Sequence, residues 1–417
     1  MKKAMKLVSL VLAVVMLLGC LAACSSKSAT TDSTASTDTA STDTAASDSS
    51  EASSDGGEIV IALISNTTGD YAQYGQPVRD GAMLYINQLN ANGGINGKQV
   101  KVLEYDDKGD GVEAVNAYNL ACDNGITAVF GATLTGPTIA LADATYEDNM
   151  PQITASATAT GVTVMEDTGE VRTNVFRACF IDPYQGAAAA TYAYKNLGYK
   201  KAAVLTDVVS DYAVGLSNFF KKSYKKLGGE LVADMKYSSG DQDFTAQLTE
   251  LISKKPDIVF MPAYFAEGAI IMKQARELGA TFVLMGGDAM DNPDTVKIAG
   301  KAAEGFMQTA FPYDMTMKDM NDQAKAFTEA WKKNFPNKDP NVNATLGYTC
   351  YDMIIDALKR AGKADREAVT KALAETKGLA TPVGIMTLNA NHDAEIPVGI
   401  LKYENGKRIY LGEIVPE

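Results

Sequence analysis

The stretch 131-GATLTGPT-138 combines residue types that bind anions. It lies between an apolar run and a helix-like run, which is also the context of a phosphate loop, but Pro137 takes the place of the lysine that a polyphosphate needs. The stretch is therefore either a damaged phosphate loop or a loop for a different anion. With Thr135 as a helix N-cap, Gly136 allowing close backbone approach and Pro137 at the first helical position, it would offer hydroxyl and N–H donors to a carboxylate.

Residues for catalysis or metal binding are scarce. The one histidine, His392, lies in a turn-like segment, which leaves no His-based zinc site and makes a Ser-His-Asp triad improbable. After the first 24 residues the cysteines are Cys122, Cys179 and Cys350, far apart and without a C-x-x-C pair. An extracytoplasmic compartment would permit a disulfide, but sequence cannot pair them, and buried thiols are the preferred interpretation. We expect no cofactor and no metal.

The N-terminus has the features of an export signal. Three lysines precede the apolar run 7-LVSLVLAVVMLL-18, which is too short to span a bilayer but fits a signal peptide. The following 21-LAAC-24 resembles a bacterial lipobox and implies cleavage before Cys24 and lipidation of its thiol. The overlapping 17-LLGC-20 is a poorer candidate, and an ordinary secretory peptide is the alternative. Residues 1–23 are thus predicted to be a lipoprotein signal peptide.

Residues 24–57 are predicted to be the lipidated cysteine and a disordered tether. Beyond Cys24 they are almost entirely Ser, Thr, Ala, Asp and Gly, which offer too little apolar surface to offset the entropy of ordering. A flexible chain of this length spans roughly 30 Å. Removal of the three leader lysines takes the formal charge from −13 to −16. An acidic body repels phosphate backbones, so nucleic acid is not expected as a partner.

From Glu58 onward, short β-rich runs alternate with amphipathic runs. Repeated βα units predict parallel sheets with helices on both faces. The alternation restarts after about residue 174, and the loops 69-GDYAQYG-75 and 210-SDYAVG-215 repeat Asp-Tyr-Ala and a glycine at equivalent places. Two similar lobes explain this repetition. In open α/β sheets ligands lie beyond the carboxyl ends of strands, where both loops are predicted.

The order and spacing of several motifs resemble the extracytoplasmic leucine/isoleucine/valine-binding proteins of ABC transporters. The resemblance extends from Glu58 to Glu417 and includes the lipobox. The motifs that carry it are 69-GDYAQYG-75, 93-GGINGKQVKVLEYDD-107, 131-GATLTG-136, 153-ITASATAT-160, 182-DPYQG-186, 205-LTDVVSDYAVG-215, 272-MKQAREL-278 and 284-LMGGD-288.

The resemblance implies an α/β fold of the periplasmic-binding-protein type I, with two doubly wound parallel-sheet lobes joined by three crossover strands. We place the crossings near 178–182, 308–312 and 378–383. Lobe 1 is then 58–178 plus 312–378, and lobe 2 is 182–308 plus 383–417.

The resemblance also implies a clamp for an amino acid's head group. The ligand carboxylate would bind at Thr135 and Gly136, and the ammonium would bind at Asp288. The loop of Ser156, Ala157 and Thr158 would add a backbone carbonyl and a hydroxyl. Tyr74 would pack on the ligand side chain, Tyr212 and Tyr264 would complete the contacts of the second lobe, and Tyr348 would line the side-chain end. The alternatives are that Thr135 only caps its own helix and that Asp288 caps the helix that follows.

The predicted function is capture of a small amino acid of the branched-chain type (Leu, Ile or Val) and its delivery to an ABC permease and its ATPase. The protein would be a monomer, anchored outside the cytoplasm to the bacterial membrane by lipid on Cys24. The first alternative keeps the fold but binds an amide, urea or aromatic acid. The others are a ligand sensor for a signalling partner, and an enzyme acting on a nucleotide sugar or dinucleotide.

Overall fold

The computed structural model describes residues 58–416. The predicted signal peptide, Cys24 and the tether lie outside these residues. Within them, no helix is both long and apolar enough to cross a membrane. The same part of the chain contains no cluster of three or more His, Cys, Asp or Glu side chains suited to a metal ion.

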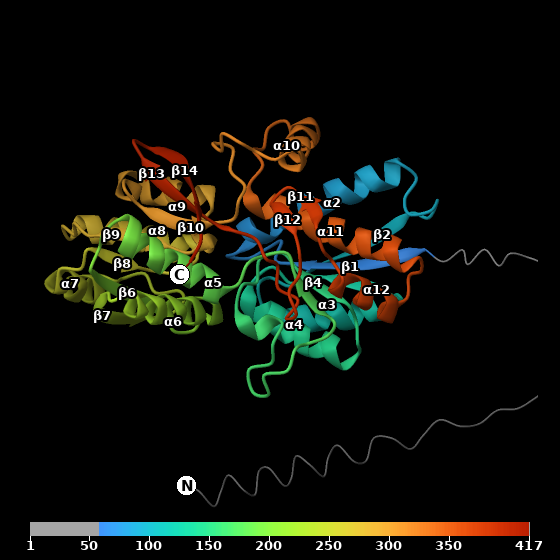
Figure 1. Cartoon of the computed structure of the whole chain (residues 1–417), viewed down its shortest axis with the longest axis horizontal. Coiled ribbons are helices and arrows are strands. Elements are labelled where there is room, and N and C mark those ends of the chain that lie inside the picture. Colours follow the sequence, from blue (N-terminus) through green and yellow to red (C-terminus); the bar gives the residue numbers. More distant parts are fainter. Residues whose placement is uncertain (1–57, 417) are drawn as a thin grey trace, which may run out of the picture. The chain divides into compact units, whose positions relative to one another are not determined.

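The first lobe is built on a five-stranded parallel sheet in the order β2-β1-β3-β4-β5 (Figure 1). Strand β1 is apolar and buried along its whole length, whereas the edge strand β2 carries charged residues and is only partly buried. The strands are β1 (Ile59–Ser65), β2 (Val100–Asp106), β3 (Ala128–Phe130), β4 (Gln152–Thr154) and β5 (Val175–Arg177). The intervening helices are α2 (Ala72–Ala91), α3 (Gly111–Cys122), α4 (Thr135–Glu147) and the 3₁₀ turn η1 (Thr160–Val162).

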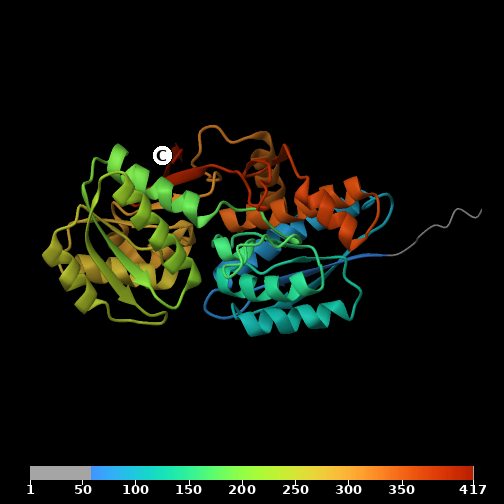
Figure 2. The same ribbon diagram turned by 60° about the horizontal axis from the view of Figure 1, so that its bottom comes forward.

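The second lobe is built on a seven-stranded sheet in the order β14-β13-β10-β9-β8-β6-β7 (Figure 2). All neighbouring strands are parallel except the pairs β10–β13 and β13–β14. The strands are β6 (Lys201–Asp207), β7 (Glu230–Tyr237), β8 (Ile258–Phe260), β9 (Val283–Gly286), β10 (Met307–Ala310), β13 (Val398–Glu404) and β14 (Lys407–Ile414). The helices are α5 (Asp182–Thr191), the π-helix η2 (Tyr192–Asn196), α6 (Asp211–Lys226), α7 (Thr245–Lys254), α8 (Phe265–Glu277), η3 (Asp288–Met290), α9 (Pro293–Ala299) and η4 (Gly300–Ala303).

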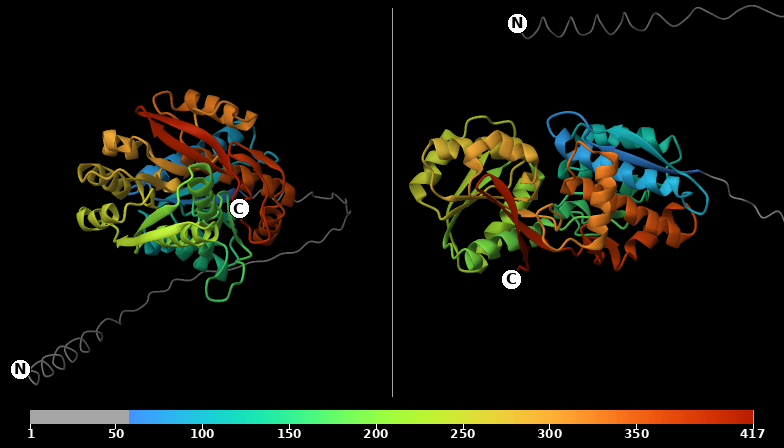
Figure 3. Two further views of the ribbon diagram at one scale, coloured as in Figure 1. Left: turned by 60° about the vertical axis from the view of Figure 1, so that its left-hand side comes forward. Right: turned by 90° about the horizontal axis from the view of Figure 1, so that it is seen from above.

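Three further helices and a hairpin complete the first lobe. They are α10 (Asp322–Asn334), α11 (Val342–Ala361), α12 (Arg366–Ala374) and the antiparallel pair β11 (Leu379–Thr381) and β12 (Gly384–Met386). Helix α11 lies directly on α2, since a side chain at Gly81 or Gly347 would collide with backbone of the other helix. Figure 3 shows α11 and α12 in orange and red beside the blue helix α2.

The last connection between the sheets differs from the one predicted. We placed the crossing at 378–383 and assigned 383–417 to lobe 2. In the structure β12 pairs with β11, and only β13 and β14 join the seven-stranded sheet. Met386, Leu388 and Ile396 pack in the same apolar cluster as α11 and α12. The chain therefore passes to the second sheet between Met386 and Val398.

Candidate ligand-binding site

One cavity lies where the strand order of both sheets reverses. In the first sheet the order reverses between β1 and β3, and in the second between β6 and β8. Ligands of open α/β sheets bind at such points. The cavity is narrow in this structure, with a free volume of about 20 Å³ for a water-sized sphere. It is lined by Tyr74, Thr133, Leu134, Thr135, Ser156, Tyr212, Tyr264, Asp288, Ala289, Phe311, Val342 and Asn343.

Helix α4 points its N-terminus at this cavity. The helix begins at Thr135, and its N-cap is Leu134, whose side chain makes no capping hydrogen bond. We predicted Thr135 as the N-cap, but it is the first helical residue. We predicted Pro137 as the first helical residue, but it is the third. The hydroxyl of Thr135 therefore does not cap its own helix. The first intrahelical bond is donated by Thr138 N–H to the Leu134 carbonyl, so the N–H groups of Thr135 and Gly136 precede the helical ladder.

The carboxyl of Asp288 lies on the opposite wall, in the second lobe. One of its oxygens accepts hydrogen bonds from Gln185 Nε2 at 2.8 Å and the Tyr212 hydroxyl at 3.0 Å. Asp288 is the first residue of η3 and does not cap it. Gly287 makes this arrangement possible, because a Cβ there would lie 2.1 Å from the Tyr212 hydroxyl. Burial raises the pKa of the Asp288 carboxyl to about 6, and the two hydrogen bonds oppose that rise.

Asp182 is a second buried acid near the site, and we did not predict it. It begins α5, is fully buried, and neither carboxylate oxygen has a hydrogen-bond partner among the described residues. Burial raises its pKa to about 8; the nearby Thr158 hydroxyl and the positive charge of Arg177 lower the value, and the charge of Asp288 adds to the rise. No lysine, arginine or histidine is among the lining residues of the cavity. Two buried acids without a lining base favour a cationic group in the ligand.

Tyr74 connects the two lobes directly. Its ring lines the cavity from α2, and its hydroxyl donates to the Ala289 carbonyl at 2.6 Å and accepts from Phe265 N–H at 2.9 Å. The Tyr264 ring packs against both Tyr74 and Tyr212, with centroid distances of 5.6 Å in each pair. The structure is thus closed over the cavity, with aromatic side chains from both lobes in contact.

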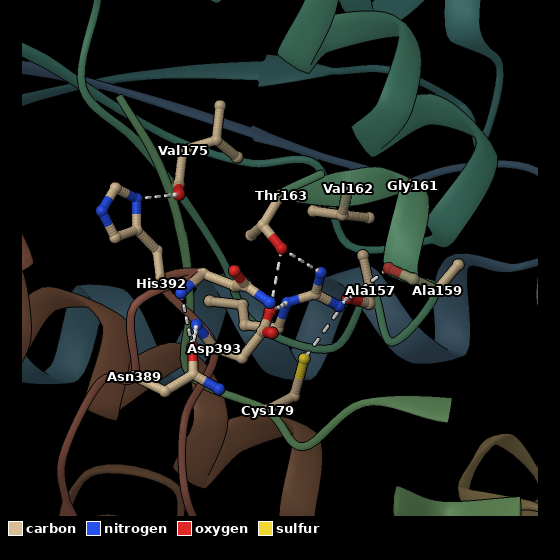
Figure 4. Close-up of polar contacts among 12 residues, drawn as sticks. Ala157, Ala159, Gly161, Val162, Thr163, Val175, Cys179, Asn389, His392 and Asp393 are labelled. Atoms are coloured by element: carbon tan, nitrogen blue, oxygen red, sulfur yellow. Dashed lines mark hydrogen bonds and ion pairs between the residues drawn. The ribbon is translucent and has the colours of Figure 1, made fainter. Parts of the chain in front are cut away.

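The loop 156–163 is held from behind by Arg177, which is completely buried (Figure 4). Its guanidinium donates to the carbonyls of Ala157 at 2.8 Å and Ala159 at 2.9 Å and to the hydroxyl of Thr163 at 2.8 Å. Its Nε lies 2.8 Å from a carboxylate oxygen of Asp393, on the last connection between the lobes. The Ala157 carbonyl therefore faces Arg177 and away from the cavity. Arg177 positions this loop without lining the cavity itself.

His392, the only histidine, belongs to this same structural cluster (Figure 4). Its ring stacks on Phe176 with centroids 4.4 Å apart, and Nδ1 lies 3.1 Å from the Val175 carbonyl oxygen. Cys122, Cys179 and Cys350 are free thiols, and the last two are buried.

The structure brings six of the nine predicted ligand residues together at the cavity: Tyr74, Thr135, Ser156, Tyr212, Tyr264 and Asp288. Gly136, Ala157 and Thr158 do not line it. Tyr348, predicted at the side-chain end, packs on Tyr85 instead, and Phe311, Val342 and Asn343 line the cavity. Phe311 lies at a predicted crossing between the lobes, and Val342 and Asn343 lie at the start of a run with a helical pattern. These positions are the signal in the sequence that could have indicated the three residues.

Residues 58–408 match the periplasmic binding protein family. A Leu/Ile/Val-binding protein homolog of Brucella melitensis is 32% identical over 368 residues, covering 86% of this chain and 95% of that protein. The Leu-, Ile-, Val-, Thr- and Ala-binding protein of Pseudomonas aeruginosa is 31% identical over 339 residues, covering 80% of this chain and 87% of that protein.

Solved structures agree in fold. The leucine-binding protein LivK of Thermotoga maritima has a TM-score of 0.79 and 35% identity, covering 86% of this chain and 99% of that one. LivJ of Streptococcus pneumoniae, solved with isoleucine, has a TM-score of 0.78 and 30% identity, with the same coverage. The chain belongs to the periplasmic binding protein family and has its type I fold. The predicted family and fold class are thereby confirmed.

Proposed function

We propose that this protein binds a small free α-amino acid between its lobes and presents it to an ABC importer. The observation that carries the proposal is the opposition of charges across one cavity. A helix N-terminus with a free threonine hydroxyl lies on one wall, and the buried carboxyl of Asp288 lies on the other. A carboxylate is stabilised by the first and an ammonium by the second, and an amino acid carries both.

In this proposal Thr135 donates to the ligand carboxylate, and the unbonded N–H of Gly136, which does not line the cavity, contributes to the positive end of helix α4. The ammonium pairs with Asp288, and it also favours the ionised form of Asp182 behind Thr158, whose pKa is raised to about 8 in the free protein. Ser156 lines the cavity, while Ala157 and Thr158 hold the loop in place. Tyr74, Tyr212 and Tyr264 enclose the ligand. Because the contacts come from both lobes, ligand stabilises the closed form by the contacts made only there.

Relatives named as Leu/Ile/Val-binding proteins support a branched-chain ligand, with transport by an ABC permease and its ATPase. Family membership supports an extracytoplasmic location, and the 21-LAAC-24 motif supports a lipid anchor at Cys24. The rival ligand class is an aromatic acid, since a Rhodopseudomonas palustris protein with this fold was solved with benzoate. Asp288 and Asp182 oppose that rival, because benzoate brings a second negative charge and no cation.

A thermal-shift panel of free amino acids, benzoate and small amides tests the proposal. A ligand at a hundredfold excess over its Kd stabilises the native state by about 2.7 kcal/mol, which is a clear upward shift in Tm. We expect the shift with one or more small amino acids. A shift with benzoate or an amide, and with no amino acid, would overturn the proposal.

A further inference from the structure

The side-chain end of the cavity has one feature that an apolar ligand leaves unused. Asn343 lines the cavity and is only 6% exposed, yet its amide makes no hydrogen bond with any described residue. The amide therefore remains free to bond a group in the cavity, and a wholly apolar ligand that covered it would leave its donors and acceptor without a partner. Its lining neighbours Leu134, Phe311 and Val342 are apolar and supply none.

The backbone at the same place adds donors. Asn343 is the second residue of the 20-residue helix α11, whose N-cap, Asn341, accepts from the N–H of Ala344. The N–H groups of Val342 and Asn343 precede the helical ladder and have no carbonyl partner within it. The contact of α11 with α2 places this N-terminus next to the helix that carries Tyr74. A helix N-terminus and a free amide together form a polar subsite on an otherwise apolar wall.

We infer that Asn343 selects an amino acid whose side chain carries a neutral hydrogen-bonding group beside an apolar one. Threonine has this composition, since its methyl group suits Phe311 and Val342 and its hydroxyl suits the amide. A side-chain carboxylate is disfavoured, because Asp288 and Asp182 already place two buried acids close together. This inference rests on the proposed function and names the class of ligand within it.

Threonine and valine provide a matched pair of ligands, because they have nearly the same shape and differ in a hydroxyl against a methyl group. A site built to bond a hydroxyl rejects the isostere that lacks it, since its own polar groups are then left unpaired. We expect the purified full chain to bind threonine at least about 10-fold more tightly than valine in isothermal titration calorimetry. This comparison needs no variant, so it does not depend on the folding of a mutant.

The variant Asn343→Leu tests the residue assignment. It keeps the approximate shape of the side chain and removes the amide, so we expect valine to bind more tightly than threonine. Alanine, whose side chain is too short to reach position 343, serves as the control ligand, and its Kd should change less than about 3-fold.

The outcomes separate the two levels of the argument. Equal Kd values for threonine and valine that Asn343→Leu does not change would overturn the inference. Tighter binding of aspartate than of threonine would also overturn it. Neither result would contradict the proposed function. The absence of binding by every amino acid would overturn the proposed function and the inference with it.

Discussion

At the scale of single residues, the site is defined by charges that the protein leaves unpaired. Asp288 is bonded by Gln185 and Tyr212, but no basic residue lines the cavity with it. Replacing a buried carboxylate that pairs with a ligand ammonium leaves the ammonium buried and unpaired. Asp288→Asn should therefore cost about 2–5 kcal/mol of binding free energy, or roughly 30- to 5000-fold in Kd.

Asp352 supplies a matched control for that substitution. Its carboxyl also accepts a hydrogen bond from a tyrosine hydroxyl, Tyr85 at 2.9 Å, but on α11 away from the cavity. Asp352→Asn should leave the Kd of the ligand unchanged in calorimetry. Equal losses of affinity in both variants would show that the effect of Asp288→Asn is structural.

Ligand binding should release protons. Burial raises the pKa of Asp288 to about 6 and that of Asp182 to about 8, and an ammonium favours the ionised form of both acids. Affinity should therefore fall as the pH falls from 8 towards 5. Calorimetry at pH 7 in buffers of different ionisation enthalpy should report net proton release, whereas proton uptake would contradict the head-group assignment.

The stability of the ligand-free protein should fall as the pH rises, whereas the affinity for the ligand should increase. Both acids have folded-state pKa values above the value of 3.8 for an unperturbed Asp, so the native state binds more protons than the unfolded state between about pH 4 and pH 8. These two acids therefore destabilise the fold progressively as the pH rises through that window. Urea unfolding of Asp182→Asn should show a weaker pH dependence than the native sequence over this range.

At the scale of elements, Arg177 connects a ligand loop to the connections between the lobes. It ends β5, immediately before the first crossing, and its partners lie in the 157–163 loop and at Asp393. Asp393→Asn leaves this guanidinium buried without its counter-charge, which costs about 3–5 kcal/mol of stability. Urea denaturation measures this loss.

Arg172 provides the comparison on the same loop. It binds the carbonyl of Gly161 at 2.6 Å and pairs with Asp143, whose side chain is 64% exposed. Because the Asp143 carboxylate lies in solvent, it contributes little to holding the buried Arg172, so Asp143→Asn should cost less than about 1 kcal/mol. Similar losses of stability in Asp393→Asn and Asp143→Asn would contradict the claim that the buried ion pair of Arg177 contributes more than that of Arg172.

The elements themselves were largely readable in the sequence, and the exceptions have physical reasons. The apolar runs that became β1, β6 and β9 are buried strands, and their composition alone identifies them as strands. Helix α7 was missed because only Leu248 and Leu251 are buried and its N-cap, Phe244, gives no capping signal. The hairpin β11–β12 was misplaced because a strand-like run does not reveal which partner it pairs with.

The site residues also divide into those that the local sequence indicates and those that depend on contacts between distant segments. Thr135 and Asp288 lie in the segments that follow strands β3 and β9, so chain order indicated their place. Asp182 resembles an ordinary first residue of a helix in the sequence. Its burial beside Thr158 depends on the approach of segments far apart in the chain, which no local pattern encodes.

At the scale of the whole molecule, the bonds of Tyr74 across the lobes should set the balance between open and closed forms. Tyr74→Phe keeps the ring and removes both bonds of the hydroxyl to Ala289 and Phe265. At about 1 kcal/mol for each bond, affinity should fall by roughly 10- to 30-fold. Small-angle X-ray scattering should show a larger radius of gyration than the native protein at the same subsaturating ligand concentration.

Tyr85→Phe is the control for that change, because the Tyr85 hydroxyl bonds Asp352 within the first lobe. It should alter neither Kd nor the scattering curve. If Tyr74→Phe behaves like this control, the hydroxyl of Tyr74 does not contribute to closure.

The central claim is that the protein recognises the ammonium and carboxylate of an amino acid together. Calorimetry with leucine and with 4-methylpentanoate, which is leucine without its ammonium, tests it most directly, and threonine with 3-hydroxybutanoate provides a second pair. We predict binding of the amino acid and at least about 100-fold weaker binding of the des-amino acid, since the carboxyls of Asp288 and Asp182 then face no cation. Equal or tighter binding of the des-amino acid would contradict the account.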